Sequence, residues 1–441
     1  MRPSLRHRGE RLRTTLTSPR GIISVAIVIN VVFWIIQTAV EWSVYGLFYV
    51  LGVDWSRFWG AARAFTHAGP RFGYDLMSIA NHMQPIASFY DHSVSNLALK
   101  VGPAPYPPIF LALFTPFTWP PPAIGFLLWV LFNLALGFPV ARHLASHFPV
   151  EQRRLMTALL LLFYPFVMAL FVGQMVVLLL FAFWKGYQAL QSGEDFRAGA
   201  WFGVMLIKPQ YAAVLLLVLL LKRRWNAIAG NVVTGFGILI SSLAVGGLGG
   251  VIAYVRMILV DYPNYSGGLA ITPQGMISWR ALVLNMEPDI SKIPGLVLTA
   301  LLSLLSLAML AVIWRGEWNP HIPRFHQQMM ATMLVSLLVA YHSQVHGAVL
   351  LMVPGALIAA RESSESFVKK VMVVSVFAPP FVVALSAIVQ GNAGMISLLF
   401  IPLMTIALVA IFKNDWYSNQ NAGQLRSRLG SLVPSRRDNP I

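Results

Sequence analysis

The sequence predicts an all-α polytopic membrane protein with about twelve transmembrane helices. Of its 441 residues, 57% are hydrophobic and only 11% are charged, which lies outside the usual range of water-soluble domains. Many apolar runs approach or exceed the roughly 18 residues that cross a bilayer, and they must be helical because lipid cannot satisfy free backbone groups. Basic residues gather at the two ends and in short loops, which is typical of the flanks of membrane helices.

Net charge and cysteine content exclude several classes of function. The net charge of +16 would suggest a nucleic-acid partner for a soluble protein. Here the positions of the basic residues indicate topology instead, so we expect no nucleic-acid partner. The chain has no Cys, which excludes disulfides, thiolate metal sites and thiol catalysis.

The chain divides into a membrane domain and two basic ends. Residues 1–20 are expected to be a cytoplasmic segment, because no small-residue cleavage site follows them and the next apolar run is long for a signal peptide. Residues 21–412 form the predicted transmembrane domain, with outer loops at about 41–105 and 248–292 that carry short amphipathic helices. Residues 413–441 are predicted to be a disordered cytoplasmic tail.

The strongest candidate for chemistry is the segment 53–65, which follows the first apolar run. It places Asp54 beside Arg57 and Arg63, so a carboxylate in a polar pocket could take a proton from a hydroxyl. The alternative is that Asp54 only caps the helix. We expect this helix to lie along the membrane surface, with aromatic side chains at the headgroup level. Its apolar face would comprise Trp55, Phe58, Trp59, Ala62 and Phe65.

The direction of the chain between Tyr106 and Leu190 is open. Tyr106 begins an apolar run behind a proline-rich entry, and Gly173-Gln174 interrupts a later run. If every run crosses, the basic residues after the third crossing fall outside, against the charge rule. If the Tyr106 helix does not fully cross, Gln174 moves outside and joins the other polar tips. Gly173-Gln174 is then either a tight turn or part of a substrate site. The basic residues concerned are Arg142, Arg153 and Arg154.

Lys208 is the second candidate, in the middle of an apolar run that ends at Leu221. A lysine at that depth costs roughly 3 kcal/mol on insertion scales, and Pro209 interrupts the hydrogen bonding of the helix beside it. We therefore expect a broken helix that turns Lys208 toward a water-filled cavity, where its ammonium could hold a phosphate. The alternative is a lysine that snorkels from a shorter helix.

Two later segments complete the candidate site. Trp279-Arg280 could stack on a sugar and bind a charged group, or could anchor the chain at the interface. The apolar stretch 329–360 is too long for one crossing, so we expect an outward helix, a polar tip and a return helix. The tip contains His342 and His346, four residues apart. They could bind a metal with a third ligand, but we favour a metal-free role toward phosphate or hydroxyl groups.

These motifs, in this order, resemble glycosyltransferase family 87, whose members are polytopic membrane enzymes of the GT-C superfamily. The resemblance covers roughly residues 20–412. The family includes mycobacterial mannosyltransferases that use polyprenyl-phosphate mannose. The chain departs from the family pattern at Tyr341-His342-Ser343, where many members have Ser-Pro-His, and at Gly347, where an acid often occurs. The matching motifs are Asp54 with Phe58-Trp59, Tyr106-Pro-Pro, Gly173-Gln174, Ile207-Lys208-Pro209, Trp279-Arg280 and the histidine tip.

The resemblance implies an inverting transfer of a sugar from a polyprenyl-phosphate donor to a lipid or glycan acceptor at the outer face of the cell membrane. Asp54 corresponds to the presumed base, Lys208 to the lysine near the donor phosphate, and His342 or His346 to the late histidine. No cofactor is required in principle, and a role for a divalent cation is left open. A lipid-linked sugar flippase is an alternative, although no internal repeat is apparent. A ligase that moves a whole lipid-linked glycan is another.

Overall fold

The computed structural model describes residues 18–45, 51–87, 101–262, 275–286, 292–361 and 400–414, and it is almost wholly helical over these ranges. One isolated antiparallel bridge joins Met276 to Gln344. The predicted basic segment 1–20 and tail 413–441 lie mostly outside the described residues, as do residues 362–399 of the predicted transmembrane domain. The helices are α2 (Pro19–Tyr45), α3 (Val53–His67), η1 (Pro70–Tyr74), α4 (Leu76–His82), α5 (Gln84–Ala87), α7 (Pro108–Phe114), η2 (Thr115–Thr118), α8 (Pro122–Ala145), η3 (Val150–Gln152), α9 (Arg153–Leu161), α10 (Tyr164–Phe171), α11 (Val176–Gln191), α12 (Asp195–Val204), η4 (Met205–Ile207), α13 (Pro209–Leu221), α14 (Trp225–Arg256), η5 (Met257–Asp261), α16 (Trp279–Met286), α17 (Lys292–Ile313), α18 (Pro323–Val339), η7 (Val345–Leu351), α19 (Met352–Arg361) and a last helix at Phe400–Asn414.

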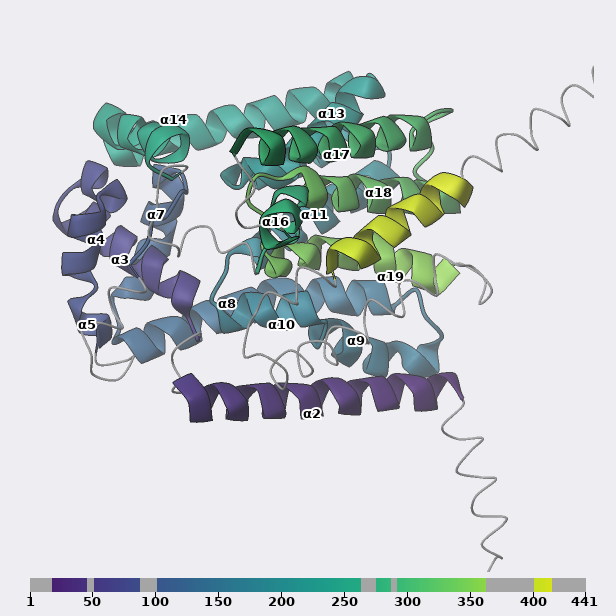
Figure 1. Ribbon diagram of the computed structural model, residues 1–441, viewed down its shortest axis with the longest axis horizontal. Helices are drawn as coiled ribbons and strands as arrows, with labels where there is room; N and C mark the ends of the chain where they lie inside the picture. The colour runs from purple at the N-terminus through teal and green to yellow at the C-terminus, as the bar shows by residue number, and fades with distance from the viewer. Residues whose placement is uncertain are drawn as a thin grey trace, which may run out of the picture.

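The helices form a layered bundle (Figure 1). α2 and α14 lie along opposite sides of it, and α8, α10 and α11 run between them. The shorter helices α3, α4, α5 and α7 gather at one end of the bundle. Short helices were expected within residues about 41–105, and η1, α4 and α5 lie there.

By length and composition, three described helices can cross a membrane: Pro122–Ala145, Trp225–Asp261 and Ile293–Ile313. A fourth crossing is added if the bent pair Val150–Leu161 and Tyr164–Phe171, with an angle of 47° between its parts, counts as one span. The helical membrane character expected from composition is thus present, while the number of about twelve crossings stays a prediction.

The aromatic face of α3 is buried inside the protein, so our expectation that these rings lie at the lipid headgroups was wrong. Trp55, Phe58 and Trp59 are each at most 2% exposed. Phe58 meets Phe110 and Phe114 of α7 edge-on, with ring centroids 5.5 and 5.7 Å apart. Apolar rings gain more from this close packing than from a place at the surface. α3 is therefore an internal element, and only part of its other face can meet solvent or substrate.

The Tyr106 run does not cross the bundle. α7 and η2 together comprise eleven residues, about 18 Å of helix, which is well short of the roughly 30 Å of a hydrocarbon core. Both of its ends contact α3. Tyr106 packs on Phe58 at 5.0 Å, and Arg63 donates to the carbonyl oxygen of Thr118 at 3.4 Å. The segment thus lies along α3. The sequence left open whether the Tyr106 helix crosses fully, and the structure shows a helix too short to do so.

The Lys208 run is broken at Lys208, as expected, and it folds back on itself. Lys208 has φ −127° and ψ 78°, outside the helical region, and Pro209 begins α13 at the position where a missing N–H costs nothing. The far ends of the two arms meet, because Arg224 after α13 forms an ion pair with Asp195 at the start of α12. Residues 195–221 are therefore a helical hairpin with Lys208 at its apex, where a single broken crossing was expected.

The ends of the other helices that lie away from Asp54 are also joined to one another. Arg361 donates to His326 Nε2 at 2.8 Å, which ties the end of α19 to the start of α18. Lys222 donates to the carbonyl oxygen of Trp314 at 2.9 Å. The first turns of α2 pack against the end of α8 and against α9, in a cluster of Ile23, Ala145 and Met156. This end of the bundle therefore collects basic residues from several helices. They are Arg20, Arg142, Lys222, Arg223, Arg224, Arg315, Arg324 and Arg361.

Candidate functional site

Asp54 is held where the start of α3 docks on the turn between α10 and α11. Gly52 adopts a left-handed conformation with φ 68° and occupies the cap position of α3. Its N–H donates to the carbonyl oxygen of Phe171 at 2.8 Å, and the Asp54 N–H donates to that of Val172 at 2.9 Å. The Asp54 carboxylate bonds to side chains: Oδ1 accepts from Arg57 Nη1 at 3.0 Å and Oδ2 from Gln174 Nε2 at 2.9 Å. The helix-cap alternative for Asp54 is therefore wrong.

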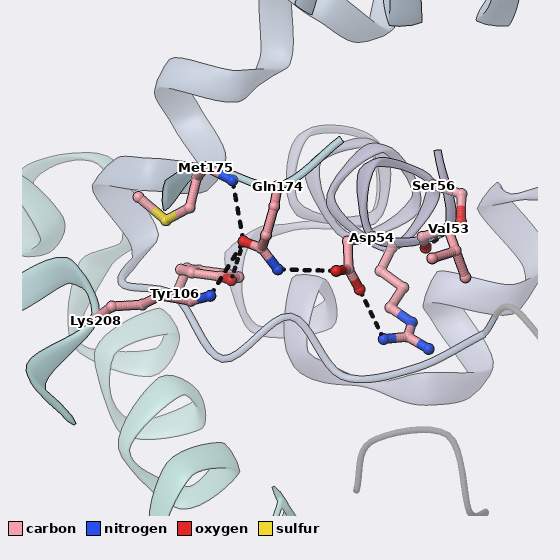
Figure 2. Close-up of polar contacts among 8 residues, drawn as sticks. Val53, Asp54, Ser56, Tyr106, Gln174, Met175 and Lys208 are labelled. Carbon is pink, nitrogen blue, oxygen red and sulfur yellow. Dashed lines mark hydrogen bonds and ion pairs between the residues drawn. The ribbon is translucent and has the colours of Figure 1, made fainter. Parts of the chain in front are cut away.

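Gln174 is the centre of the polar network (Figure 2). Its Oε1 accepts three hydrogen bonds, from Tyr106 OH at 3.1 Å, from Lys208 Nζ at 3.1 Å and from the Met175 N–H at 3.0 Å. A continuous chain of contacts therefore runs from Lys208 through Gln174 to Asp54. With Tyr106, the network brings together four separate segments of the sequence.

Lys208 lies in an aromatic enclosure. Its Nζ is 5.5 Å from the ring centre of Tyr106 and 5.9 Å from that of Tyr211, within the range of cation–π attraction. The residue is 8% exposed. Gly347 makes this arrangement possible, because a Cβ at residue 347 would come within 2.4 Å of the Tyr211 hydroxyl. The Lys208 side chain thus points inward from the hairpin apex, and the snorkelling alternative is wrong.

The tip after α18 forms the other wall of the site. The expected helix, polar tip and return helix are present as α18, residues 340–344, and η7 with α19, while the direction of α18 across the membrane stays a prediction. The Ile277 N–H donates to the carbonyl oxygen of Ser343 at 2.7 Å, which docks the segment before α16 on this tip. Arg280 then lies over the Tyr341 ring, with its guanidinium carbon 4.2 Å from the ring centre. His342 meets Tyr262 edge-on at 5.7 Å.

Among the described residues, positive charge is in excess around His342. Lys208, Arg57 and Arg280 all act electrostatically on this imidazole. Burial, together with these cations, lowers the pKa of His342 to about 3, so the ring is neutral at physiological pH. Asp54 is the one carboxylate that pairs with any of the three cations among the described residues. The described part of the site therefore has an excess positive charge.

Several buried polar atoms at this wall have no hydrogen-bond partner among the described residues. They are Arg280 Nη1, His342 Nδ1 and Ser278 Oγ. Burying such atoms without a partner costs free energy, so their presence in one place indicates a site for a polar ligand. A cationic donor and a neutral imidazole suit an anionic or hydroxyl-rich ligand.

The comparison with protein families identifies the chain. The model of glycosyltransferase family 87 matches residues 105–340, more than half of the sequence. The chain belongs to glycosyltransferase family 87. It is a membrane glycosyltransferase. Neither the comparison with curated proteins nor the comparison with solved structures gave a match.

The matched range of this family 87 glycosyltransferase contains one part of the site and omits another. Tyr106, Gln174, Lys208 and Arg280 lie within it. Asp54 lies before the range, and the two tip histidines lie just after it. The family match therefore supports the activity of the chain, whereas the roles of individual residues depend on their geometry.

Besides Arg280 and His342, three predicted residues of the glycosyltransferase lie outside the hydrogen-bonded Asp54 network. Arg63 lies over the Trp59 ring at 4.7 Å, near the far end of α3. Trp279 is 6% exposed and donates to Ser306 Oγ at 2.9 Å, so its indole packs between α16 and α17 and is not an interfacial anchor. His346 is buried and close enough to Lys208 to interact electrostatically, but it lies in the first turn of η7 and does not share a continuous helix with His342.

Sequence reasoning missed several residues that shape the site. Trp129 donates from Nε1 to the carbonyl oxygen of Gly173 at 2.9 Å and so fixes the turn that carries Gln174. Tyr211 lines the Lys208 enclosure, and Tyr262 borders His342. The position of Tyr211, three residues after Lys208 and near the start of a helix, could have indicated that the two side chains lie close together. Within the described ranges, no group of three or more His, Asp or Glu residues is arranged to hold a metal ion.

Proposed function

We propose that this chain transfers a sugar, with mannose favoured, from a polyprenyl-phosphate sugar to a hydroxyl of a lipid or glycan acceptor. The observation that carries the proposal is the concentration of positive charge: Lys208 and Arg280 both act electrostatically on His342, and among the described residues no carboxylate forms an ion pair with either of them. A phosphate diester supplies the missing negative charge. The phosphate gains a second negative charge when the sugar leaves, so these cations stabilise the transition state more than the bound donor. The preference for mannose as the transferred sugar rests on the family resemblance alone.

The proposed chemistry is a single displacement. The acceptor oxygen bonds to the anomeric carbon while Asp54 takes the proton of that hydroxyl. The bond between the anomeric carbon and the phosphate oxygen breaks, and the leaving phosphate keeps the electron pair. Lys208 and Arg280 bind that phosphate, and the neutral His342 donates or accepts a hydrogen bond beside it. A direct attack from the opposite face inverts the anomeric carbon. Neutralisation by cationic side chains makes a metal unnecessary in this scheme.

We also propose that the site faces the outside of the cell membrane and that both termini are cytoplasmic. Because the Tyr106 segment does not cross, α8 leads inward and the basic residues 142, 153 and 154 lie on the same side as 222–224. That distribution obeys the charge rule, which the alternative path of the chain violates. Asp54 and Gln174 then lie at the opposite, outer end, where a lipid-linked donor can bind with its tail between helices.

The decisive experiment compares the wild type with Asp54→Asn. Purified protein in lipid nanodiscs is given radiolabelled polyprenyl-phosphate sugars together with membrane lipid extract, and labelled product is separated by chromatography. We expect label to enter a new product with the wild type and to fall about 10²–10⁴-fold with Asp54→Asn, since a positioned general base contributes a factor of that size. Donor binding should remain, because the cations are intact.

Asp75→Asn is the matched control. Asp75 caps α4 by accepting from the Ser78 N–H at 2.7 Å, and Asn caps equally well. This variant should transfer like the wild type. Full activity of Asp54→Asn would refute the proposed base. A wild type that transfers nothing, but moves labelled lipid across proteoliposomes, would support a flippase, and transfer of an entire oligosaccharide would support a ligase.

A further inference from the structure

The amide of Gln174 can face its neighbours in one orientation only. Lys208 Nζ and the Met175 N–H are donors without any acceptor capacity, so the end of the amide that meets both must be the oxygen. The NH₂ end therefore meets Asp54 Oδ2 at 2.9 Å. A flipped amide would place its N–H groups against two donors and its oxygen against a carboxylate. The protein thus selects this orientation without help from a ligand.

The backbone that carries Gln174 is equally constrained. Gly173 has φ +72°, and a Cβ there would lie 2.4 Å from the Cβ of Trp55. The Gln174 N–H donates to the carbonyl oxygen of Ala169 at 2.7 Å. The start of α3 is hydrogen-bonded to the same turn through Phe171 and Val172. The segments bearing Asp54 and Gln174 are therefore one rigid unit.

Gln174 has little capacity left to bind a substrate directly. Its Oε1 already accepts three hydrogen bonds, and the residue is 5% exposed. Lys208 donates one of its three N–H groups to Gln174, so two remain for a ligand. The Asp54 carboxylate uses one lone pair on each oxygen for Arg57 and Gln174, so further acceptor positions remain for a hydroxyl proton.

We propose that Gln174 is a positioning residue that sets the distance and orientation between the phosphate-binding Lys208 and the base Asp54. This inference rests on the proposed function, and it replaces the sequence-based assignment of Gln174 to substrate binding. Its role is to hold the acceptor-activating and donor-binding groups in one geometry before either substrate arrives. Tyr106 supports it by donating to the same oxygen.

The first test is Gln174→Met, which keeps the length of the side chain and removes both polar ends. We expect kcat to fall about 10²-fold, because a small misplacement of reacting groups costs that much, while KM for the lipid-phosphate donor changes less than about fivefold. A substrate-binding role would instead raise KM. A Gln174→Met variant with wild-type kcat would overturn the inference.

The second test is Gln174→Glu, which keeps the shape but places a second carboxylate oxygen against Asp54 Oδ2. Two carboxylates at this distance share a proton. The acidic limb of the rate profile should therefore move to higher pH, with activity returning as the shared proton leaves. An acidic limb that coincides with that of the wild type would contradict the Gln174–Asp54 contact. The charged or titratable groups that act on Asp54 among the described residues are Arg57, Tyr106, Lys208, Tyr211 and Tyr262.

A stability measurement separates this inference from the proposed function. The shared proton makes Gln174→Glu lose thermal stability relative to the wild type as pH rises, because the folded pair binds a proton that the unfolded chain has released. Adding Asp54→Asn should abolish this dependence. If the wild type transfers no sugar, the proposed function fails, yet this pair of melting profiles still decides whether Gln174 positions Asp54. Parallel profiles for Gln174→Glu with and without Asp54→Asn would refute the inference.

Discussion

Replacing Gly173 with Ala should damage both the stability and the activity of the protein. Gly173 has φ +72°, and an L-residue in that conformation costs roughly 1–2 kcal/mol. The new Cβ would also lie 2.4 Å from the Cβ of Trp55 and 3.2 Å from Phe126, and such overpacking typically costs about 1–3 kcal/mol. The expected loss in the free energy of unfolding is therefore about 2–5 kcal/mol. Relief of the clash moves Trp55 and, with it, the neighbouring Asp54.

Gly193→Ala is a closely matched control for this prediction. Gly193 has φ +75°, almost the same backbone conformation, but nothing lies within 4 Å of a Cβ built there. The Gly193→Ala variant should lose only about 1–2 kcal/mol of unfolding free energy, from the backbone conformation alone. It should keep wild-type transfer, because residue 193 lies far from the site. Thermal unfolding in detergent and the transfer assay measure the two effects. Equal melting temperatures and equal activities for the two variants would refute the packing argument.

Two further predictions concern the cations and the imidazole. Lys208→Met should weaken inhibition by polyprenyl phosphate about 10–100-fold, since a charge-assisted hydrogen bond contributes about 1.5–3 kcal/mol, and an unchanged inhibition constant would remove Lys208 from the phosphate site. His342 has a pKa lowered to about 3, so the unfolded chain takes up a proton below about pH 6.5 that the folded protein does not. The free energy of unfolding should therefore fall as the pH drops from 7.5 to 5, and in His342→Gln this fall should be smaller by about 2 kcal/mol. Parallel stability profiles for the wild type and His342→Gln would argue against a buried neutral ring.

Local sequence patterns predicted the parts of the site in which a charged or polar residue interrupts an apolar run. Lys208 beside Pro209 predicted a broken helix, and the polar tip around His342 predicted the turn between α18 and η7. Both features violate the rule that membrane segments avoid charge and breaks, so one sequence suffices to detect them. The roles proposed for these residues remain to be tested.

The remaining features depend on tertiary contacts that no local pattern encodes. An apolar run beginning at Tyr106 is compatible with a crossing or with a short helix along α3, and only the contacts of Phe58 and Arg63 decide between them. The aromatic face of α3 has the composition of a surface helix because lipid and protein interior are equally apolar. The role of Gln174 depends on which donors surround its oxygen, and these come from segments far apart in the sequence.

The short segment α7 also has a consequence for how the protein is made. Its Ile109 N–H is 3.4 Å from Ser242 Oγ of α14, a residue 133 positions later in the chain. At the roughly 5–20 residues per second of protein synthesis, about 7–27 s separate the two residues at the ribosome. During that interval α7 has α3 on one side and no α14 on the other. Assembly of the wall that carries Tyr106 is therefore completed late, after the longest helix of the described chain has entered the membrane.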